Sequence, residues 1–323
     1  MHLPIESMSK AISALPINIF KPPFQTPLQP MFRLQAFLSG PRLMVKRDDL
    51  TPFGGGKYRK VFVLVEDACK QGATVLLTEG SIESRHAKTV AILARQKGIP
   101  CVLVLSPEVD PDSKELTLLD NDEGARIILT KHWRGRKRAL AQASKQLEAK
   151  GERPVIIPFS GSTPLTALAY AHAFLEIKEQ IEALGLTLDA IFFSSASGGI
   201  QSGLELGKRQ ARANGTKIIG VTPGLPVSEI KEQTVELATA AAKLLGIKLT
   251  LRRRDICIMD NYAGKGYLKP TPESRTAITL ASELEGLTLD PTYTAKAFAA
   301  LIDQIKKRRF LEDQTVVFLH TAG

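Results

Sequence analysis

Lys57 directly follows three successive glycines, in the stretch from Phe53 to Lys60 that reads FGGGKYRK. Glycine tolerates positive φ and lets the backbone pass close to another group, so this run would deliver the lysine at the start of a helix. A lysine amine becomes nucleophilic near neutral pH when an apolar or cationic setting lowers its pKa. Basic neighbours lie close by in the sequence: Lys46, Arg47, Arg59 and Lys60. The stretch therefore makes Lys57 a candidate for covalent chemistry, but a glycine-rich run with one lysine is a weak signal, and a solvated lysine behind a flexible turn explains it as well.

Two further stretches place small residues between an expected strand and an expected helix. Gly80 to His86 reads GSIESRH, and its hydroxyls and helix N-terminal N–H groups would suit a substrate carboxylate. A plain N-cap serine is the alternative here. Ser194 to Gly203 reads SSASGGIQSG, where backbone N–H groups and the helix dipole would attract a phosphate. This stretch lacks the GK[ST] ending of a nucleotide P-loop and the GxGxxG of a dinucleotide fold.

Two tyrosines and the C-terminal stretch complete the candidate residues. Tyr267 lies in GKGYLKPTPE and Tyr293 in LDPTYTAKAF. A phenol near a substrate can bind it or shuttle a proton, whereas a half-buried packing tyrosine is the alternative. His320 to Gly323, reading HTAG, follows an expected strand.

In their order along roughly Leu34 to Gly323, these stretches resemble the pyridoxal-phosphate enzymes of the tryptophan-synthase β type. The resemblance is to the branch that holds D-cysteine desulfhydrase and aminocyclopropane-carboxylate deaminase. KRDDL at 46–50 followed by GGGKYRK at 54–60 is similar to the loop that carries the Schiff-base lysine of that branch. The resemblance implies that Lys57 holds pyridoxal 5'-phosphate as an imine and, once displaced by substrate, removes or returns the α-proton. Gly56 stands where the branch has asparagine.

The resemblance also implies roles for the glycine- and serine-rich stretches. Ser84 falls on the serine that contacts substrate and would bind its carboxylate. Arg85 replaces the asparagine that hydrogen-bonds the phenolic oxygen of the cofactor, and His86 would be a packed or orienting residue rather than the base. The phosphate cup would be formed by Ala196, Ser197, Gly198, Gly199 and Ile200, although family members usually have a hydroxyl where Ile200 stands.

The remaining implied roles lie near the C-terminus. Tyr267 and Tyr293 fall in segments like those that bring two active-site tyrosines over the cofactor, and Tyr293 would assist proton transfer or departure of the leaving group. Thr321 matches the Ser or Thr that contacts the pyridine nitrogen. Where this chain has Tyr293-Thr294, the similar cyclopropane-opening branch has Tyr-Glu, and where this chain has Thr321, that branch has a bulky apolar residue. At both places the residues of this chain resemble those of the desulfhydrases.

Short apolar runs alternate with amphipathic helical patterns along most of the chain, which predicts mostly parallel sheets covered on both faces. Residues 1–30, rich in proline, are expected to be irregular. Strands are expected at 74–78, 101–105, 126–130, 155–158, 190–194, 217–221, 248–251 and 315–319. Helices are expected at 61–71, around 87–94, and at 136–149, 164–184, 200–213, 228–245, 272–285 and 294–307.

The elements alone do not separate one long sheet from two domains. The resemblance favours two doubly wound, three-layer α/β/α domains, with the cofactor in the cleft between them. It implies a large domain of residues 1–57 and 166–323 and a small domain of residues 58–165.

Composition bounds the class of protein. With 323 residues, 44% of them hydrophobic, the chain can bury a large core. Its few, widely spaced cysteines (Cys69, Cys101 and Cys257) fit a reducing compartment and give no metal-ligand spacing. The absence of a long apolar run or a signal peptide pattern predicts a cytoplasmic protein without a membrane anchor.

A net charge of +10 raises nucleic-acid binding as a possibility from another class. The basic clusters at 131–138, 252–254 and 306–309 are more typical of solvated element ends, because aromatic residues are not interleaved with them.

The sequence thus predicts a pyridoxal-phosphate-dependent lyase that catalyses α,β-elimination of a small amino acid. The best candidate is D-cysteine, giving sulfide, pyruvate and ammonia. Aminocyclopropane-carboxylate deamination is the second enzymatic hypothesis. A homologue that has lost catalysis and is retained for binding is a third, motivated by the departures at Gly56, Arg85 and Ile200. Relatives suggest a homodimer, and the side chain and handedness of the substrate stay open.

Overall fold

The computed structural model describes residues 25–52, 55–107 and 124–322, so Phe53, Gly54 and Gly323 of the stretches above lie outside the described residues. The chain divides into two compact units. Unit 1 comprises Met1–Gly56 and Ala167–Gly323, and unit 2 comprises Lys57–Thr166. That these units are the two domains expected from the sequence stays a prediction, as does a cofactor site between the domains.

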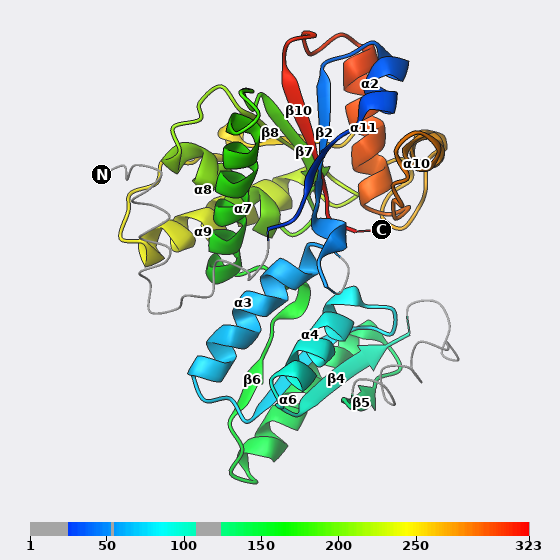
Figure 1. The fold of residues 1–323 in the computed structure, drawn as a ribbon. Helices are drawn as coiled ribbons and strands as arrows, with labels where there is room; N and C mark the ends of the chain where they lie inside the picture. The colour runs from blue at the N-terminus through cyan, green and yellow to red at the C-terminus, as the bar shows by residue number, and fades with distance from the viewer. Residues whose placement is uncertain (1–24, 53–54, 108–123, 323) are drawn as a thin grey trace. The chain divides into compact units, whose positions relative to one another are not determined.

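Unit 2 is built on a parallel sheet of four strands in the order β5-β4-β3-β6. The strands are β3 (Val75–Ser81), β4 (Cys101–Ser106), β5 (Arg126–Leu129) and β6 (Pro154–Ile156). Alternate residues of β3 and β4 form one core with α6 (Arg136–Glu148), and α4 (Arg85–Gln96) packs on the same two strands and on α3 (Lys57–Lys70) (Figure 1). Because successive side chains of a strand point to opposite faces, helices cover both sides of this sheet.

Unit 1 holds a sheet of six strands in the order β1-β2-β10-β7-β8-β9. Only β1, which pairs with β2, is antiparallel among these strands. The strands are β1 (Leu28–Pro30), β2 (Arg42–Arg47), β7 (Ala190–Ser194), β8 (Lys217–Val221), β9 (Cys257–Met259) and β10 (Thr315–His320).

The helices of unit 1 fall into two groups. A core that includes Phe192 and Phe318 lies between the sheet and the helices α2 (Phe32–Leu38), α10 (Pro272–Glu285) and α11 (Thr294–Lys306). Figure 1 shows the other group beyond the opposite face of the sheet: α7 (Pro164–Glu182), α8 (Gly199–Gln210) and α9 (Val227–Leu244). Both units are therefore three-layer α/β/α structures with mostly parallel sheets, which confirms the predicted fold class.

Most predicted elements are confirmed, with differences at their ends. α3 begins at Lys57, four residues before the expected start at Val61. Residues 1–24 of the segment expected to be irregular lie outside the described residues. At its end the expectation was wrong, because β1 forms there, and the sequence analysis did not anticipate α2 or β2.

The strand expected at 248–251 was also wrong. Leu249 and Leu251 pack with Ala238 and Ile256 without forming a ladder, so their alternation reflects packing alone. The place beside β8 is taken by β9 instead.

Candidate active site

Lys57 is the first residue of α3, and its side chain is held within unit 2. Its Nζ donates a hydrogen bond to the backbone oxygen of Ser160 at 3.0 Å. Burial lowers the pKa of Lys57 to about 8, because an apolar setting disfavours the charged ammonium. A pKa near 8 leaves part of the amine unprotonated at neutral pH, which is the property that the sequence analysis required of a covalent lysine.

The carbonyl that accepts from Lys57 belongs to a strained turn. Ser160 lies in the short helix η3 (Phe159–Gly161) with φ of 67°, in the left-handed region that non-glycine residues rarely adopt. Such a conformation costs on the order of 1–2 kcal/mol and persists only where the surrounding structure imposes it. The strain thus lies at the point where the turn meets the candidate lysine.

Two other titratable groups, Lys60 and His86, lie beside Lys57. Lys60 donates to Ser162 Oγ at 3.0 Å, and burial together with the charge of Lys57 lowers its pKa well below the usual value. Burial, Lys57 and Lys60 lower the pKa of His86 to about 3. His86 is therefore neutral near pH 7, which fits a packed or orienting residue better than a general base.

A short hydrogen-bond chain fixes the His86 ring. Thr78 Oγ1 donates to the backbone oxygen of Ile157 at 2.8 Å. Since that hydroxyl has a single hydrogen, it accepts from His86 Nε2, which lies 3.1 Å away. The tautomer inferred from this network carries its proton on Nε2.

Ser84 is the N-cap of α4, so the alternative of a capping serine describes its contact here. Its Oγ accepts from the Ala87 backbone N–H at 3.3 Å. A Cβ at Gly80 would lie 2.6 Å from Ser84 Cβ, so glycine makes room for the serine at the end of β3. Arg85, the first residue of α4, is exposed.

The residues just before Lys57 are bound to the end of β10 within unit 1. The Gly56 N–H donates to the backbone oxygen of Thr321 at 2.7 Å. Gly55 has φ of 104°, and a Cβ there would lie 2.2 Å from the same oxygen, so glycine is required. The backbone before the candidate lysine is thereby tied to Thr321, the residue expected beside the pyridine nitrogen.

Tyr170 occupies the space beside Gly56, where the resembling branch has asparagine. A Cβ at Gly56 would lie 2.4 Å from Tyr170 Oη, and that hydroxyl donates to the Gly56 carbonyl at 3.0 Å. Tyr170 comes from α7 and is fully buried. The phenol therefore contacts the loop at the position from which an asparagine side chain would extend.

The turn from β7 into α8 has the features of a phosphate cup. Gly198 is the N-cap with φ of 69°, and no side chain caps the helix. A Cβ there would lie 2.9 Å from the Thr234 backbone nitrogen, so the turn also needs glycine for space. The first N–H groups of a helix have no intrahelical acceptor, which is the property that the predicted phosphate site requires. Gly199 is buried, and Ala196, Ser197 and Ile200 are half-buried.

Tyr267 and Tyr293 meet within unit 1. Their hydroxyls are hydrogen-bonded, and their rings cross at 67° with centroids 5.9 Å apart. Tyr293 precedes α11, and Asp290 Oδ1 accepts from its backbone N–H at 2.7 Å while Oδ2 accepts from that of Thr294 at 3.0 Å. The sequence predicted both tyrosines as site residues, and the structure brings their phenols together.

The predicted site residues are divided between the units. Lys57, Ser84 and Arg85 belong to unit 2, whereas the phosphate turn, both tyrosines and Thr321 belong to unit 1. The roles assigned to them stay predictions. Sequence reasoning missed Ser160, Tyr170 and Lys296; the detectable signal was a lone lysine inside the apolar helical run AKAFAALI around Lys296.

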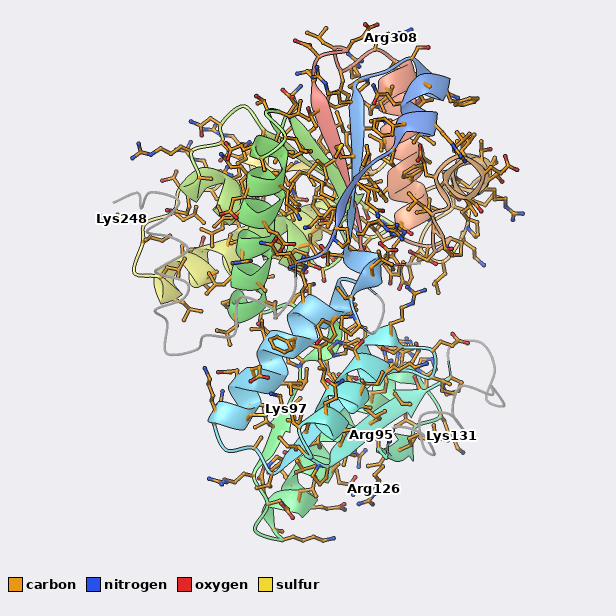
Figure 2. All side chains as sticks on the ribbon, in the orientation of Figure 1. Arg95, Lys97, Arg126, Lys131, Lys248 and Arg308 are labelled. Carbon is orange, nitrogen blue, oxygen red and sulfur yellow. The ribbon has the colours of Figure 1, made fainter. Side chains whose placement is uncertain are left out.

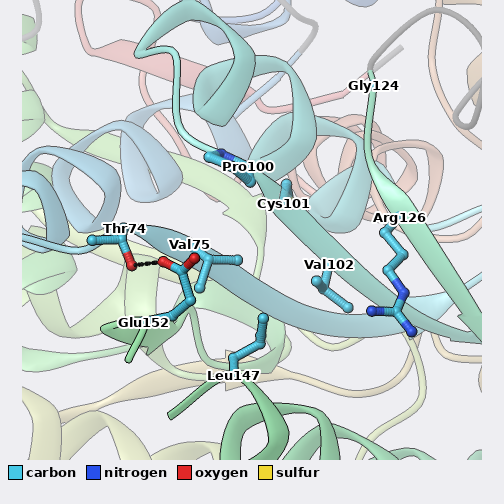
Figure 3. A pocket seen from close by; sticks show the side chains of 9 residues that line it. All are labelled: Thr74, Val75, Pro100, Cys101, Val102, Gly124, Arg126, Leu147 and Glu152. Atoms are coloured by element: carbon cyan, nitrogen blue, oxygen red, sulfur yellow. Dashed lines mark hydrogen bonds between the residues drawn. The ribbon is translucent and has the colours of Figure 1, made fainter. Parts of the chain in front are cut away.

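A pocket of about 200 Å³ lies elsewhere in unit 2, at the amino ends of β3, β4 and β5 (Figure 3). Ligands of parallel α/β sheets bind at the carboxyl ends of the strands. Ser84 follows the carboxyl end of β3, so it lies at the opposite end of the sheet from this pocket. The pocket includes Cys101, and burial raises the pKa of its thiol to about 12, which disfavours a reactive thiolate. We therefore do not assign the reaction to this pocket.

Basic side chains are spread over both units, as Figure 2 shows for Arg95, Arg126 and Lys248. The expectation that no aromatic residue interleaves with the basic clusters was wrong at Trp133, over whose ring Arg134 lies at 5.4 Å. Within the described ranges, no group of three or more His, Cys, Asp or Glu residues could hold a metal ion. In the same part of the chain, every helix is too short or too polar to cross a bilayer.

Comparison with known proteins places these features in a family context. A family model described as "Pyridoxal-phosphate dependent enzyme" matches residues 19–322. A D-cysteine desulfhydrase of Yersinia enterocolitica is 34% identical over 306 residues, covering 92% of this chain and 91% of that protein. A D-cysteine desulfhydrase of Salmonella newport is 36% identical over 305 residues, with 92% and 91% covered. A crystal structure described as an ACC deaminase homologue matches with a TM-score of 0.85 at 29% identity, covering 98% of this chain and 94% of that one.

Proposed function

This chain belongs to the family of pyridoxal-phosphate-dependent enzymes, and from that premise we propose that it catalyses the α,β-elimination of a small amino acid, with D-cysteine as the best candidate. D-Cysteine would lose its β-thiol as sulfide, and hydrolysis of the remainder would give pyruvate and ammonia. The names of the two desulfhydrases, at 34% and 36% identity, support this substrate.

The residues present fit the cofactor. When bound, pyridoxal 5'-phosphate withdraws electrons from the α-carbon of an amino acid and so stabilises a short-lived carbanion. Lys57 would hold the cofactor covalently through Nζ, and the turn from Ala196 to Ile200 would hold its phosphate. The glycine at 198, required by φ and by space, and the α8 N-terminus without a side-chain cap support this assignment.

Lys57 would also move the α-proton, and the observation that carries the proposal is its place at the start of α3, with Nζ donating to the Ser160 carbonyl. An amine with a pKa of about 8 can both accept and return a proton near neutral pH, whereas one with the ordinary value of 10.5 would hold it. The Ser160 carbonyl would orient this amine through its hydrogen bond.

The other predicted residues would bind and orient the substrate. Ser84 would bind the substrate carboxylate at the α4 N-terminus, and Arg85 would face the phenolic oxygen of the cofactor. Tyr293, hydrogen-bonded to Tyr267, would donate or relay a proton to the leaving sulfide. Thr321, a neutral hydroxyl, would contact the ring nitrogen without holding it protonated.

Aminocyclopropane-carboxylate deamination is the second candidate, favoured by the match to a structure described as an ACC deaminase homologue. Thr294 and Thr321 argue against it, because the cyclopropane-opening branch has glutamate and a bulky apolar residue there. A homologue that has lost catalysis is supported by Arg85 and Ile200. At Gly56 that argument is weaker, because Tyr170 contacts the loop where asparagine is missing.

Two measurements test the proposal. Reduction of the cofactor-loaded protein with borohydride, followed by peptide mapping, should mark Lys57, and Lys57→Ala should leave no marked peptide. The purified enzyme should release sulfide and pyruvate from D-cysteine faster than from L-cysteine. Formation of 2-oxobutanoate from aminocyclopropane carboxylate, with no sulfide released from D-cysteine, would favour the second candidate. If neither substrate is turned over, a binding protein would be favoured.

We also propose a cytoplasmic homodimer that has no nucleic-acid or membrane partner. The unpaired state of Cys69, Cys101 and Cys257 supports a reducing compartment. The dimer is supported only by the resemblance, and sedimentation velocity at two protein concentrations would test it.

A further inference from the structure

Lys296 is a buried cation whose partners are all backbone carbonyls. The side chain lies on α11 and is fully buried. Its Nζ donates to the carbonyl oxygens of Pro223 at 2.7 Å, Ala263 at 2.8 Å and Gly266 at 2.9 Å. Three acceptors match the three N–H groups of an ammonium, so the arrangement requires the protonated amine.

A buried ammonium lowers the stability of the folded state unless its hydrogen bonds offset the free energy of desolvating the charge. Burial lowers the pKa of Lys296, and none of its three partners is a carboxylate that would offset this loss. An apolar residue would fit the surrounding apolar run of α11 at lower cost. The lysine must therefore contribute something other than packing.

The three carbonyls belong to two loops that press against each other. Pro223 follows β8, and Ala263 and Gly266 lie in the loop that carries Tyr267. A Cβ at Gly224 would lie 2.4 Å from the Tyr267 backbone nitrogen, so the two backbones touch there. The ammonium of Lys296 thus joins both loops to α11 at the residue directly before Tyr267.

The same helix begins beside the partner of Tyr267. Tyr293 is the N-cap of α11, three residues before Lys296, and its hydroxyl is hydrogen-bonded to that of Tyr267. Tyr267 is 38% exposed, and its ring contacts that of Tyr293 edge to face. The hydrogen bond to the Gly266 carbonyl and the contact between the phenols therefore act on either side of this residue.

We propose that Lys296 is a positioning residue that holds the Tyr267 loop on α11 and so keeps the two phenols in register for proton transfer. This inference rests on the proposed function for its catalytic consequence. The structural part, the hold on residues 260–269, does not depend on any activity.

The structural part is tested by hydrogen exchange on the cofactor-loaded protein. Lys296→Met removes the three donors and keeps an unbranched apolar chain, and it should raise amide exchange in residues 260–269 about tenfold or more. Lys265→Met is the matched control, since it removes one positive charge from the same loop at an exposed residue. Equal exchange in Lys296→Met, Lys265→Met and wild type would overturn the proposal, whether or not the protein is an enzyme.

The catalytic part is tested by a double-mutant cycle with Tyr267→Phe. Both Lys296→Met and Tyr267→Phe should lower kcat about tenfold or more with a smaller change in KM, and the double variant should be no worse than the worse single one. Additive losses would mean that Lys296 acts only through general stability. A wild-type protein without activity would sink the proposed function, while the exchange result would still decide the loop contact.

Chemical rescue supplies a second check if Lys296→Met does not fold. In Lys296→Ala, added methylammonium can present three N–H donors to the same carbonyls, and it should restore slow exchange in residues 260–269. Tetramethylammonium, which has no N–H donor, is the control. Rescue by both ions, or by neither, would contradict a specific role for the ammonium donors.

Discussion

At the scale of single residues, the central feature is an amine whose pKa lies near neutrality. The lysine at 57 owes its pKa of about 8 to burial, and its Nζ donates to the backbone carbonyl of Ser160. Its neighbours Lys60 and His86 are also shifted toward their neutral forms, by burial and by the positive charge of nearby lysines. Burial thus lowers the pKa of both amines and of the imidazole, and His86 is neutral near pH 7.

The cofactor-free protein should therefore capture pyridoxal phosphate in a pH-dependent way. Only the unprotonated amine attacks an aldehyde, so the rate of forming the lysine-bound cofactor should rise about tenfold per pH unit below pH 8 and level off above it. Stopped-flow absorbance from pH 6 to 10 measures this rate, and Lys57→Ala is the blank. A rate that still rises about tenfold per unit up to pH 10 would mean that the amine has its ordinary pKa and is solvated.

The same shift predicts how stability changes with pH. Since the folded pKa of Lys57 lies below the unfolded value of 10.5, the folded state bears a penalty below pH 8 that disappears as pH rises toward 10.5. Lys57→Met removes the penalty. The difference in unfolding free energy between this variant and wild type should therefore shrink between pH 8 and 10.5 in denaturant titrations of the cofactor-free protein.

Crowding at Gly56 gives a prediction about packing. Gly56→Ala should lower the free energy of unfolding by about 1–3 kcal/mol, because its Cβ would meet Tyr170 Oη at 2.4 Å. Combining it with Tyr170→Phe removes the hydroxyl and should recover part of the loss. Gly215→Ala, at a glycine with no atom within 4 Å and an ordinary φ, is the control and should be nearly neutral. Equal effects at both glycines would show that the contact is unimportant.

At the scale of elements, four of the candidate residues lie where a strand or turn leads into a helix. Lys57 begins α3, Ser84 caps α4, Gly198 caps α8 and Tyr293 precedes α11. Helix N-termini offer backbone N–H groups and a favourable dipole to anions, which explains why carboxylate and phosphate contacts are expected there.

The turn before α8 can be tested with two alanine substitutions. Gly198→Ala and Gly246→Ala both place a Cβ on a residue with positive φ, but only at 198 would it also contact a neighbour, at 2.9 Å. Both should lose about 1 kcal/mol of stability from backbone strain. Only Gly198→Ala should raise the Kd for pyridoxal phosphate, about tenfold or more by equilibrium titration. An unchanged Kd at 198 would argue against the phosphate assignment.

Much of this element pattern could be predicted from sequence. The apolar runs AIFFS and CVLVL are buried strands, and their composition identifies them without knowledge of the strands they pair with. The contacts of the site could not. The hydrogen bond from Tyr170 to Gly56 joins residues 114 positions apart, and the contact of Gly55 with Thr321 depends on how β10 enters the sheet. Alternation at 248–251 predicted a strand wrongly, because packing of Leu249 and Leu251 produces the same pattern.

At the scale of the whole molecule, the excess of positive charge is the property most open to another interpretation. The net charge is +10, and basic side chains lie on separate elements of each unit. The exposed Trp133 has Arg134 over its ring and His132 beside it, at 5.4 Å and 5.6 Å between centres, so neighbouring side chains already contact the indole.

No specific nucleic-acid complex is therefore expected. In retardation assays with single-stranded and duplex DNA at about 150 mM salt, binding should be absent, and any binding at low salt should fall steeply as salt rises. A complex that survives moderate salt and is lost in Trp133→Ala would contradict this and would point to a stacking surface on unit 2.

The strand order of unit 1 has a consequence for how the protein is made. β10 lies between β2 and β7, so the middle of the sheet comes from residues 315–320, which leave the ribosome after the other five strands of the sheet. Until then β2 and β7 present edges with unused backbone donors and acceptors, whereas unit 2 is one continuous segment that can collapse early. In nascent chains halted before residue 310, unit 2 should accordingly resist protease. Unit 1 should stay sensitive to protease and should bind chaperones.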